Sequence, residues 1–313
     1  MLPIVPLMWA ARAAGHEILV TTTSEMTEVG ARAGLPVVDV FPHRDVWSEL
    51  LAAIFGNADG GGGDDLPEEY RLAKKNGNPF GLFTLTMTEG TIAAGRMFDA
   101  DVVIYTSDHA AGRLAAVALA APALEVGNRV SWSMRDEQFR AEHDTTGADE
   151  ITRLLRAKLD IGDGDPELVA RIDPRAPSMG GLTADEPDRR DAVPWWSMRF
   201  VSYNGGAVVP EWALRRPARP RVCVTMGTVV PIMTGTSNLS AVMSFTAAAL
   251  EVSAEMATQP SPSAVIERLT RKLPRSARSQ RTCTARSGTS GPGRICQPGS
   301  PGEAEVRSGR GGS

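Results

Sequence analysis

Short β-branched runs alternate with helical segments at close spacing, and this alternation constrains the fold more than any other feature of the chain. Residues 17–22 (EILVTT) predict a strand, and residues 2–14 predict a helix whose two prolines fit only in or before its first turn. Alternation of this kind is typical of α/β folds with a parallel sheet. The pattern continues with helices at 24–32 (capped by Ser24, ended by Gly34), 80–98 and 109–119, and strands at 37–40, 101–105 and 122–126.

The next part of the chain is less regular. Charged helical patterns at 133–143 and 149–159 predict surface helices. Residues 161–194 are rich in Pro, Gly and Asp, which indicates a long connection, and 198–202 predict one more strand. Residues 204–220 have the composition of an interdomain linker.

A strand–turn–helix unit follows that linker. In residues 219–231 (RPRVCVTMGTVVP), Val222, Val224 and Met226 alternate with smaller residues and a Gly-Thr turn follows, and helical pattern resumes near Ser237. Units of this kind hold phosphate at a helix N-terminus in α/β proteins. Little sequence after this unit could complete a second sheet.

Composition excludes several classes of protein. The net charge of −4 over 313 residues does not suit a nucleic-acid-binding chain, and three cysteines do not make a disulfide framework. No apolar run could span a bilayer and no signal peptide is visible, so we expect a cytoplasmic protein without a membrane span. The Arg-, Gly- and Ser-rich residues 274–313 cannot bury a core, and we expect a disordered basic tail there.

Five segments resemble a known family of enzymes. The segments LPIVPLMWAARAAGHEILVTTT, ARAGLPVV, ARIDPRAPS, MRFVSYNGG and RPRVCVTMGTVVP are similar to bacterial glycosyltransferases that attach deoxysugars to antibiotic aglycones. The resemblance implies the GT-B architecture, in which two Rossmann-like domains face each other across a cleft. It implies an acceptor-binding domain at 1–203, a linker at 204–220, part of a nucleotide-sugar-binding domain at 221–273 and the tail at 274–313.

The chain departs from this family in three ways. The family begins with a strand and a loop that carries a His, the expected general base, shortly before the segment matching residues 2–6; here neither is present, and His16 is no substitute. A His-Gly-Gly-x-Gly motif that cradles the diphosphate is absent. Residues 249–273 resemble the last helices of the family but follow directly after the first unit of the second domain, which predicts an internal deletion.

Candidate donor-side and orienting residues lie after predicted strands. Thr225, Gly227 and Thr228 sit where the family's first strand of the second domain meets the donor, and their hydroxyl and N–H groups could bond a diphosphate or only form a turn. Asp108 follows the strand at 101–105 and could orient a catalytic base, although Thr106 is the position matching the family's carboxylate. The alternative for Asp108 is a helix N-cap.

Candidate acceptor residues are Trp132 and Met134, since aromatic and thioether side chains suit an apolar aglycone, although core packing is equally consistent. Trp195 and Trp196 are interpreted as packing against the linker. The four His lie far apart, and residues 160–167 resemble a calcium loop in composition only, so we expect no metal and no cofactor.

The function that the resemblance implies is transfer of a deoxysugar, with inversion, from a nucleotide-diphosphate sugar, usually dTDP-linked, to a hydroxyl of a hydrophobic, polyketide-like acceptor. Some relatives need an activator protein that resembles a haem-less cytochrome P450, which we would place near residues 149–159. The alternative is a non-catalytic remnant that keeps the acceptor domain without turnover. A third possibility, nucleic-acid binding through the basic tail, is weaker because the tail lacks aromatic residues.

Overall fold

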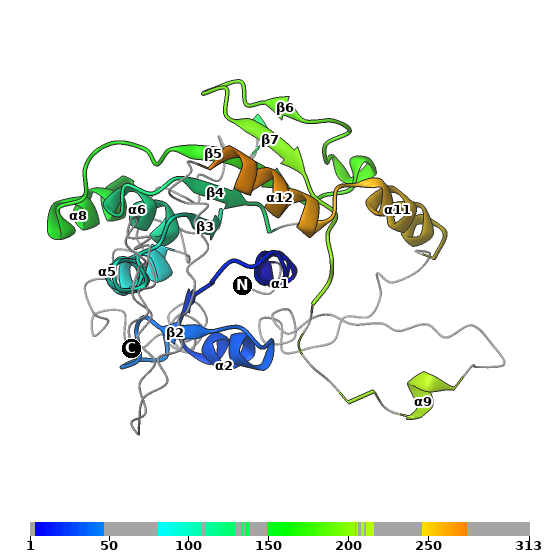
Figure 1. Ribbon diagram of the computed structural model, residues 1–313, viewed down its shortest axis with the longest axis horizontal. Coiled ribbons are helices and arrows are strands. Elements are labelled where there is room, and N and C mark those ends of the chain that lie inside the picture. The colour runs from blue at the N-terminus through cyan, green and yellow to red at the C-terminus, as the bar shows by residue number, and fades with distance from the viewer. Residues whose placement is uncertain are drawn as a thin grey trace, which may run out of the picture.

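The computed structural model shows an α/β architecture with two parallel sheets and helices on their faces (Figure 1). The residues that the structure describes are 4–46, 81–107, 110–128, 133, 135–137, 149–203, 205, 208–209, 211–215 and 246–273. The α/β class expected from the alternating helices and strands is confirmed.

The first sheet is small and follows the predicted pattern. Its strands β1 (Val20–Thr22) and β2 (Val37–Asp39) pair in parallel, and α1 (Val5–Ala13) and α2 (Glu25–Arg32) precede them in turn. α1 has its proline within the first turn, as expected. Gly34 has φ +73°, a left-handed conformation that suits glycine after a helix.

The second sheet has five strands in the order β3-β4-β5-β7-β6. All neighbours are parallel except the short edge pair β6–β7. The described elements of this part are α5 (Gly81–Phe98), β3 (Val103–Thr106), α6 (Ala111–Ala118), β4 (Ala123–Val126), α8 (Asp149–Leu159), β5 (Leu168–Asp173), the 3₁₀ turn η3 (Pro177–Met179), β6 (Glu186–Pro187) and β7 (Pro194–Ser197).

Two expectations in this region are wrong. Residues 161–194 are not only a connection, because they contain the central strand β5 as well as η3 and β6. The last parallel strand is Pro194–Ser197 and not 198–202, so Trp195 and Trp196 are strand residues. β5 was not predicted as a strand because Arg171 and Asp173 interrupt its apolar residues. Both charged residues are nevertheless buried, because each forms ion pairs.

Two predicted helix caps are also corrected. Ser24 occupies the N-cap position of α2 but makes no capping bond, and its φ is +56°. Ala110 occupies the N-cap position of α6, two residues after Asp108. The Ala110 N–H donates to Thr84 Oγ1 of α5 (3.0 Å), so a neighbouring helix supplies the acceptor that we expected from Asp108.

One face of both sheets packs against α1 and α12 (Pro262–Lys272). A single apolar cluster joins α1, β1, β4, β5 and β7 with Val265, Ile266 and Leu269 of α12. Figure 1 shows α12, in orange, lying beside α1, in dark blue, although more than 240 residues separate them in the sequence.

The opposite face packs against α5, α6 and α8. α5 approaches β2 closely, since a Cβ on Gly90 would lie 2.3 Å from the Val40 carbonyl oxygen, and it also contacts α6 and α8. α8 is amphipathic: it buries Ile151 and Leu155 and exposes charged side chains, in agreement with the predicted surface helix.

The last described helices also contact residues that follow β5 in the chain. Beside α12, α11 (Thr246–Thr258) places Glu255 where its carboxylate accepts the Ser178 N–H (2.9 Å). The Arg199 N–H donates to the Pro260 carbonyl (2.8 Å). Arg268 of α12 lies over the Trp196 ring, 4.0 Å from its centre.

Several predicted segments lie outside the described residues. These are most of the helix at 133–143, much of the linker at 204–220, the strand and turn at 219–231, the start of the helix predicted from near Ser237, and the tail at 274–313. The later part of that predicted helix is described as α11, and α9 (Glu211–Leu214) is the one helix described within the linker range. None of the helices within the described ranges is both long and apolar enough to cross a membrane.

Docking of α12 can be tested by truncating its buried face. Ile266→Ala is expected to lower the free energy of unfolding by about 2–5 kcal/mol, because it leaves a cavity between α12 and α1. Glu267→Ala, on the exposed side of the same helix, is the control. Urea denaturation followed by circular dichroism measures both variants, and equal midpoints would contradict docking of α12 on the N-terminal sheets.

Candidate functional site

The carboxyl ends of the parallel strands lie along one edge of the second sheet. Register aligns Thr106 of β3 with Val126 of β4 and Ile172 of β5, and Asp173 of β5 with Ser197 of β7. In open α/β sheets this edge is where ligands bind. The candidate site is therefore built from the residues that follow these four strands.

Asp173 is the centre of this edge. It is the last residue of β5 and is fully buried. Arg175 donates to it from its backbone N–H (3.0 Å to Oδ1) and from its guanidinium (2.9 Å from Nη2 to Oδ2). Charge-assisted, bidentate bonds of this kind hold both side chains in one geometry.

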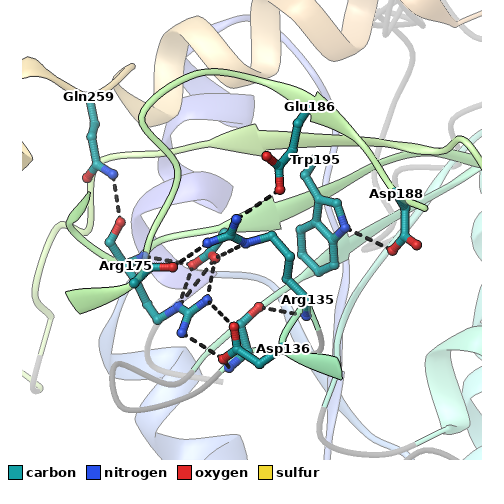
Figure 2. A network of polar contacts seen from close by, with 10 residues as sticks. Arg135, Asp136, Arg175, Glu186, Asp188, Trp195 and Gln259 are labelled. Carbon is teal, nitrogen blue, oxygen red and sulfur yellow. Dashed lines mark hydrogen bonds and ion pairs between the residues drawn. The ribbon is translucent and has the colours of Figure 1, made fainter. Parts of the chain in front are cut away.

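Arg135 and Asp136 join this pair from the loop after β4 (Figure 2). Arg175 Nη1 donates to Asp136 Oδ2 (2.9 Å), and Arg135 Nε lies 3.4 Å from Asp173 Oδ2. Arg135 Nη1 also donates to Glu186 Oε1 of β6 (2.8 Å). These five residues, Asp173, Arg175, Arg135, Asp136 and Glu186, are called the Asp173 cluster below.

The Asp173 cluster also reaches the C-terminal helices. Gln259, between α11 and α12, donates from Nε2 to the Arg175 carbonyl (2.7 Å). Gly181 lies so close to this point that a Cβ would come within 2.0 Å of the same carbonyl oxygen. The backbone around Arg175 is thus fixed from two sides.

The charged groups of this cluster bond to one another and stabilise one arrangement of the loops that carry them. Burial alone would lower the pKa of Arg175, but its bonds to Asp173 and Asp136 outweigh burial and raise that pKa above its usual value. The guanidinium therefore stays charged, and the carboxylates are occupied as its acceptors. What the cluster can do is hold the loops at the carboxyl edge in place.

A second polar row crosses the face of the sheet that carries Arg171. Tyr105, Glu125, Arg171 and Trp195 are register neighbours on β3, β4, β5 and β7. Tyr105 Oη donates to Glu125 Oε2 (3.2 Å), and Arg171 makes a bidentate pair with Asp191 (2.7 and 2.9 Å). The row attaches the loop after β6 to the sheet.

Asp188 completes this row. It accepts from Trp195 Nε1 (2.9 Å) and from Arg190 Nη2 (2.9 Å). Burial raises its pKa, but the bonds from Arg190 and Trp195 outweigh burial and hold that pKa well below its usual range. Burial dominates instead at Glu125, whose pKa is raised, and at Tyr105, whose pKa is raised well above its usual value by burial and by the charge of Glu125.

None of the site residues expected from the sequence lies among the described residues. Asp108, Trp132, Met134, Thr225, Gly227 and Thr228 all lie outside those ranges, so their roles stay predictions. For Asp108, Trp132 and Met134, residues next to them in the sequence are described. Ser107, which follows β3, and Ser133, whose N–H donates to Asp136 (3.0 Å), both belong to the carboxyl edge.

The residues of the Asp173 cluster were not among our site candidates. Asp173 and Arg175 lie within ARIDPRAPS, a segment used only for the family resemblance. The available signal was the alternation of apolar and charged residues in LVARID, bounded by Pro166 and Pro174. A strand that ends on Asp, followed by Pro and Arg, places charge at the carboxyl edge of a sheet.

Two further observations concern ligands. Within the described ranges, no group of three or more His, Cys, Asp or Glu residues could hold a metal ion. A cavity of about 230 Å³ lies between β1 and β3, away from the Asp173 cluster and with mostly apolar lining residues. The carboxyl edge and this cavity are separate features.

Comparison with known proteins identifies the family. The erythromycin biosynthesis protein CIII-like N-terminal domain matches residues 9–227, which is well over half of the chain. The chain therefore belongs to this family. The family resemblance that we inferred from the sequence segments is confirmed by this match and by the similar glycosyltransferases described next.

Similar proteins include several transferases of antibiotic biosynthesis. The chain is 29% identical over 240 residues to elloramycin glycosyltransferase ElmGT of Streptomyces olivaceus, covering 73% of this chain and 55% of the relative. It is 29% identical over 264 residues to tylactone mycaminosyltransferase of Streptomyces fradiae, covering 72% and 54%. The chain thus spans about half the length of these relatives.

Solved structures confirm the fold. The glycosyltransferase SsfS6 of Streptomyces sp. SF2575, crystallised with thymidine diphosphate, superposes with a TM-score of 0.62 at 21% identity, covering 87% of this chain and 96% of that chain. This likeness establishes a GT-B glycosyltransferase fold with Rossmann-like parallel sheets.

The bidentate geometry of Arg175 can be tested with a substitution that keeps its charge. Arg175→Lys is expected to lower the free energy of unfolding by about 2–3 kcal/mol, because a lysine cannot bond Asp173 and Asp136 at once. Arg153→Lys, on the exposed side of α8, is the matched control. Equal unfolding midpoints for the two variants in urea would show that only the charge of Arg175 matters.

The pKa of Asp188 predicts a pH-dependent contribution to stability. Asp188→Asn is expected to lower the free energy of unfolding by about 3–5 kcal/mol at pH 7, since Arg190 and Arg171 lose a buried counter-charge. The folded pKa is below the unfolded one, so the unfolded chain binds more protons in acid. The difference between wild type and variant should therefore shrink as the pH falls below about 4.

Urea denaturation at pH 7, 5, 4 and 3 measures this difference. Asp163→Asn, an exposed substitution in the turn after α8, is expected to leave the free energy of unfolding unchanged at every pH. A wild-type-to-variant difference that stays constant down to pH 3 would show that the Asp188 carboxylate is not held charged by its partners.

Proposed function

We propose that this chain takes part in transfer of a deoxysugar from a nucleotide-diphosphate sugar to a hydroxyl of a polyketide-like secondary metabolite. The observation that carries the proposal is the family match over residues 9–227, together with relatives named for attaching sugars to antibiotic scaffolds. The similar structure of SsfS6 is a complex with thymidine diphosphate, which supports a dTDP-linked donor.

The carboxyl edge of the second sheet is the acceptor side of this proposal. Arg135 and Asp136 belong to the Asp173 cluster, and Ser133 donates its N–H to Asp136. In the sequence these residues flank the predicted acceptor residues Trp132 and Met134. A rigid edge suits an apolar aglycone, because a preformed cleft loses little entropy when the ligand binds. Asp108, two residues after the end of β3, is the proposed orienting carboxylate.

Donor binding is assigned to Thr225, Gly227 and Thr228. Hydroxyl and backbone N–H groups at these positions would bond the diphosphate and stabilise charge on the leaving group as the sugar is transferred. In the scheme that the family resemblance implies, the family's His base removes the proton of the acceptor hydroxyl, whose oxygen attacks the anomeric carbon with inversion as the nucleotide diphosphate leaves. The reaction needs no metal in this scheme.

An activator protein of the P450-like kind is proposed as a partner. α8 is the proposed contact, because its inner face packs on α5 while Leu154 and its charged neighbours are exposed. The donor, the aglycone and this activator are the partners that the family resemblance implies.

The acceptor side is tested by ligand binding. Met134→Ala and Trp132→Ala are each expected to weaken binding of a polyketide aglycone by about tenfold, since each removes an apolar contact worth roughly 1–2 kcal/mol. Met97→Ala, at an exposed position near the end of α5, is the control. Isothermal calorimetry with the purified chain measures the affinities, and equal values for all three variants would contradict the acceptor assignment.

Transfer itself is tested by mass spectrometry of the aglycone after incubation with a dTDP-deoxysugar. Sugar attached to the acceptor supports the proposal. Aglycone binding without any attached sugar, with and without the activator, would overturn transfer and favour a binding domain without turnover.

A further inference from the structure

Three parts of the chain meet around Arg175 at the carboxyl edge of the second sheet. Arg175 follows β5 and is 3% exposed. Its guanidinium donates to Asp136, after β4, and its carbonyl accepts from Gln259, between α11 and α12. Figure 2 shows Gln259 and Asp136 on opposite sides of Arg175. The loop after β5 is therefore bonded both to the C-terminal helices and to the loop after β4.

Gln259 reaches this loop from a fixed backbone position. It stands directly before Pro260, whose carbonyl accepts the Arg199 N–H (2.8 Å). α12 follows and buries Val265 and Ile266 in the apolar cluster that also contains α1. The backbone that carries Gln259 is therefore anchored to the folded core.

Packing alone does not explain the amide of Gln259. The residue is 8% exposed, and its Nε2 donates to the Arg175 carbonyl at 2.7 Å. Its Oε1 has no hydrogen-bond partner among the described residues. A buried acceptor without a partner costs free energy, so an apolar side chain of the same size would fill this place at a lower cost. The bond to Arg175 is what distinguishes Gln259 from such a side chain.

Two anchors fix the direction in which the Arg175 guanidinium points. Asp173, at the end of β5, accepts from the backbone N–H (3.0 Å) and from Nη2 (2.9 Å). Gln259 holds the carbonyl on the other side of the same residue. With the backbone held at both ends, Nη1 and Nη2 reach the two carboxylate oxygens of Asp136 at 2.9 and 3.3 Å.

Asp136 in turn orders the residues before it. Its Oδ2 accepts the Ser133 N–H (3.0 Å), its own N–H donates to the Ser133 carbonyl (2.9 Å), and Ser133 Oγ accepts the Arg135 N–H (3.1 Å). The Asp136 side chain is 40% exposed, and its charge-assisted bonds to the buried Arg175 keep the carboxylate in this turn instead of in solvent.

We propose that Gln259 is a positioning residue for the acceptor side, because its bond to the Arg175 carbonyl sets the geometry of residues 133–136. The inference rests on the proposed function, in which the neighbouring Trp132 and Met134 contact an apolar aglycone. Gln259 itself touches no substrate in this scheme. It acts through the bonds of Arg175, so its loss loosens the acceptor loop without removing an acceptor contact.

Amide hydrogen exchange tests this positioning role without any ligand. Gln259→Met removes the donor but fills a similar space. The Ser133 amide is expected to exchange about three- to tenfold faster relative to the Ala123 amide, which donates to the Glu167 carbonyl beside the sheet. Val265→Ala, which loosens α12 at a buried apolar position, is the matched control and should leave this ratio unchanged.

A double-mutant cycle tests whether Gln259 acts through Arg175. Arg175→Lys already weakens the bonds to Asp136, so adding Gln259→Met to it should speed Ser133 exchange by less than about twofold more. A full further increase of about three- to tenfold would show independent contributions and would overturn the route through Arg175.

Calorimetry with a polyketide aglycone gives the functional readout. Gln259→Met is expected to raise the Kd by about three- to tenfold, whereas Val265→Ala should keep the wild-type Kd at a temperature where both variants are folded. If the wild-type chain binds no aglycone, the proposed function has failed, and the Ser133 exchange ratio still decides whether Gln259 orders residues 133–136.

Two further results would overturn the proposal. Ser133 exchange that is the same in wild type and Gln259→Met, or that rises equally in Val265→Ala, would show that Gln259 only contributes to packing. An unchanged aglycone Kd in Gln259→Met, together with faster Ser133 exchange, would show that the order of residues 133–136 does not govern acceptor binding.

Discussion

The pairing of charges on one face of β5 is the interaction on which the rest of the second sheet depends. Ala170 and Ile172 face the α1–α12 core, while Arg171 and Asp173 point to the opposite face and are also buried. Leaving either charge without its partner would cost several kcal/mol. The loops on that face therefore bring the counter-charges: Arg135 and Arg175 lie beside Asp173. Asp188 and Asp191, after β6, lie beside Arg171.

This arrangement explains why a strand with two charged residues can lie in the middle of a parallel sheet. Such strands usually read as continuous apolar runs because helices cover both faces. Here helices cover one face of β5, and loops that carry carboxylates and arginines cover the other. The same loops form the carboxyl edge, so the sheet's stability and the geometry of the proposed acceptor side rest on one set of ion pairs.

Sequence reasoning succeeded where secondary structure follows local chemistry. β1 to β4 are compact β-branched runs, and α1, α2, α5, α6 and α8 have clear helical periodicity, so all of them were predicted within a few residues. It failed at β5 and β7, because Arg171, Asp173 and Trp195 are buried through contacts with Asp191, Arg135 and Asp188, which the apolar periodicity of a strand does not reveal. The two predicted capping bonds failed for a similar reason: Ser24 occupies the N-cap of α2 without a side-chain bond, and the Ala110 N–H at the start of α6 donates to Thr84 of α5.

The site was predicted less well than the fold. Family resemblance pointed to residues that lie outside the described ranges, and the cluster that organises the described edge was found only from its contacts. Periodicity finds elements that bury apolar surface, but it does not reveal which charged residues will meet. The segment ARIDPRAPS carried that information only as a similarity, without the geometry that explains it.

The contact between α1 and α12 has a consequence for how the protein is made on the ribosome. The first helix finishes its core only when Ile266 and Leu269 have emerged, some 250 residues later in the sequence. At a synthesis rate of about 5–20 residues per second, α12 emerges roughly 12–50 s after α1. During that interval the part of α1 that α12 covers in the folded chain stays exposed, so the order of synthesis affects folding as well as the final packing.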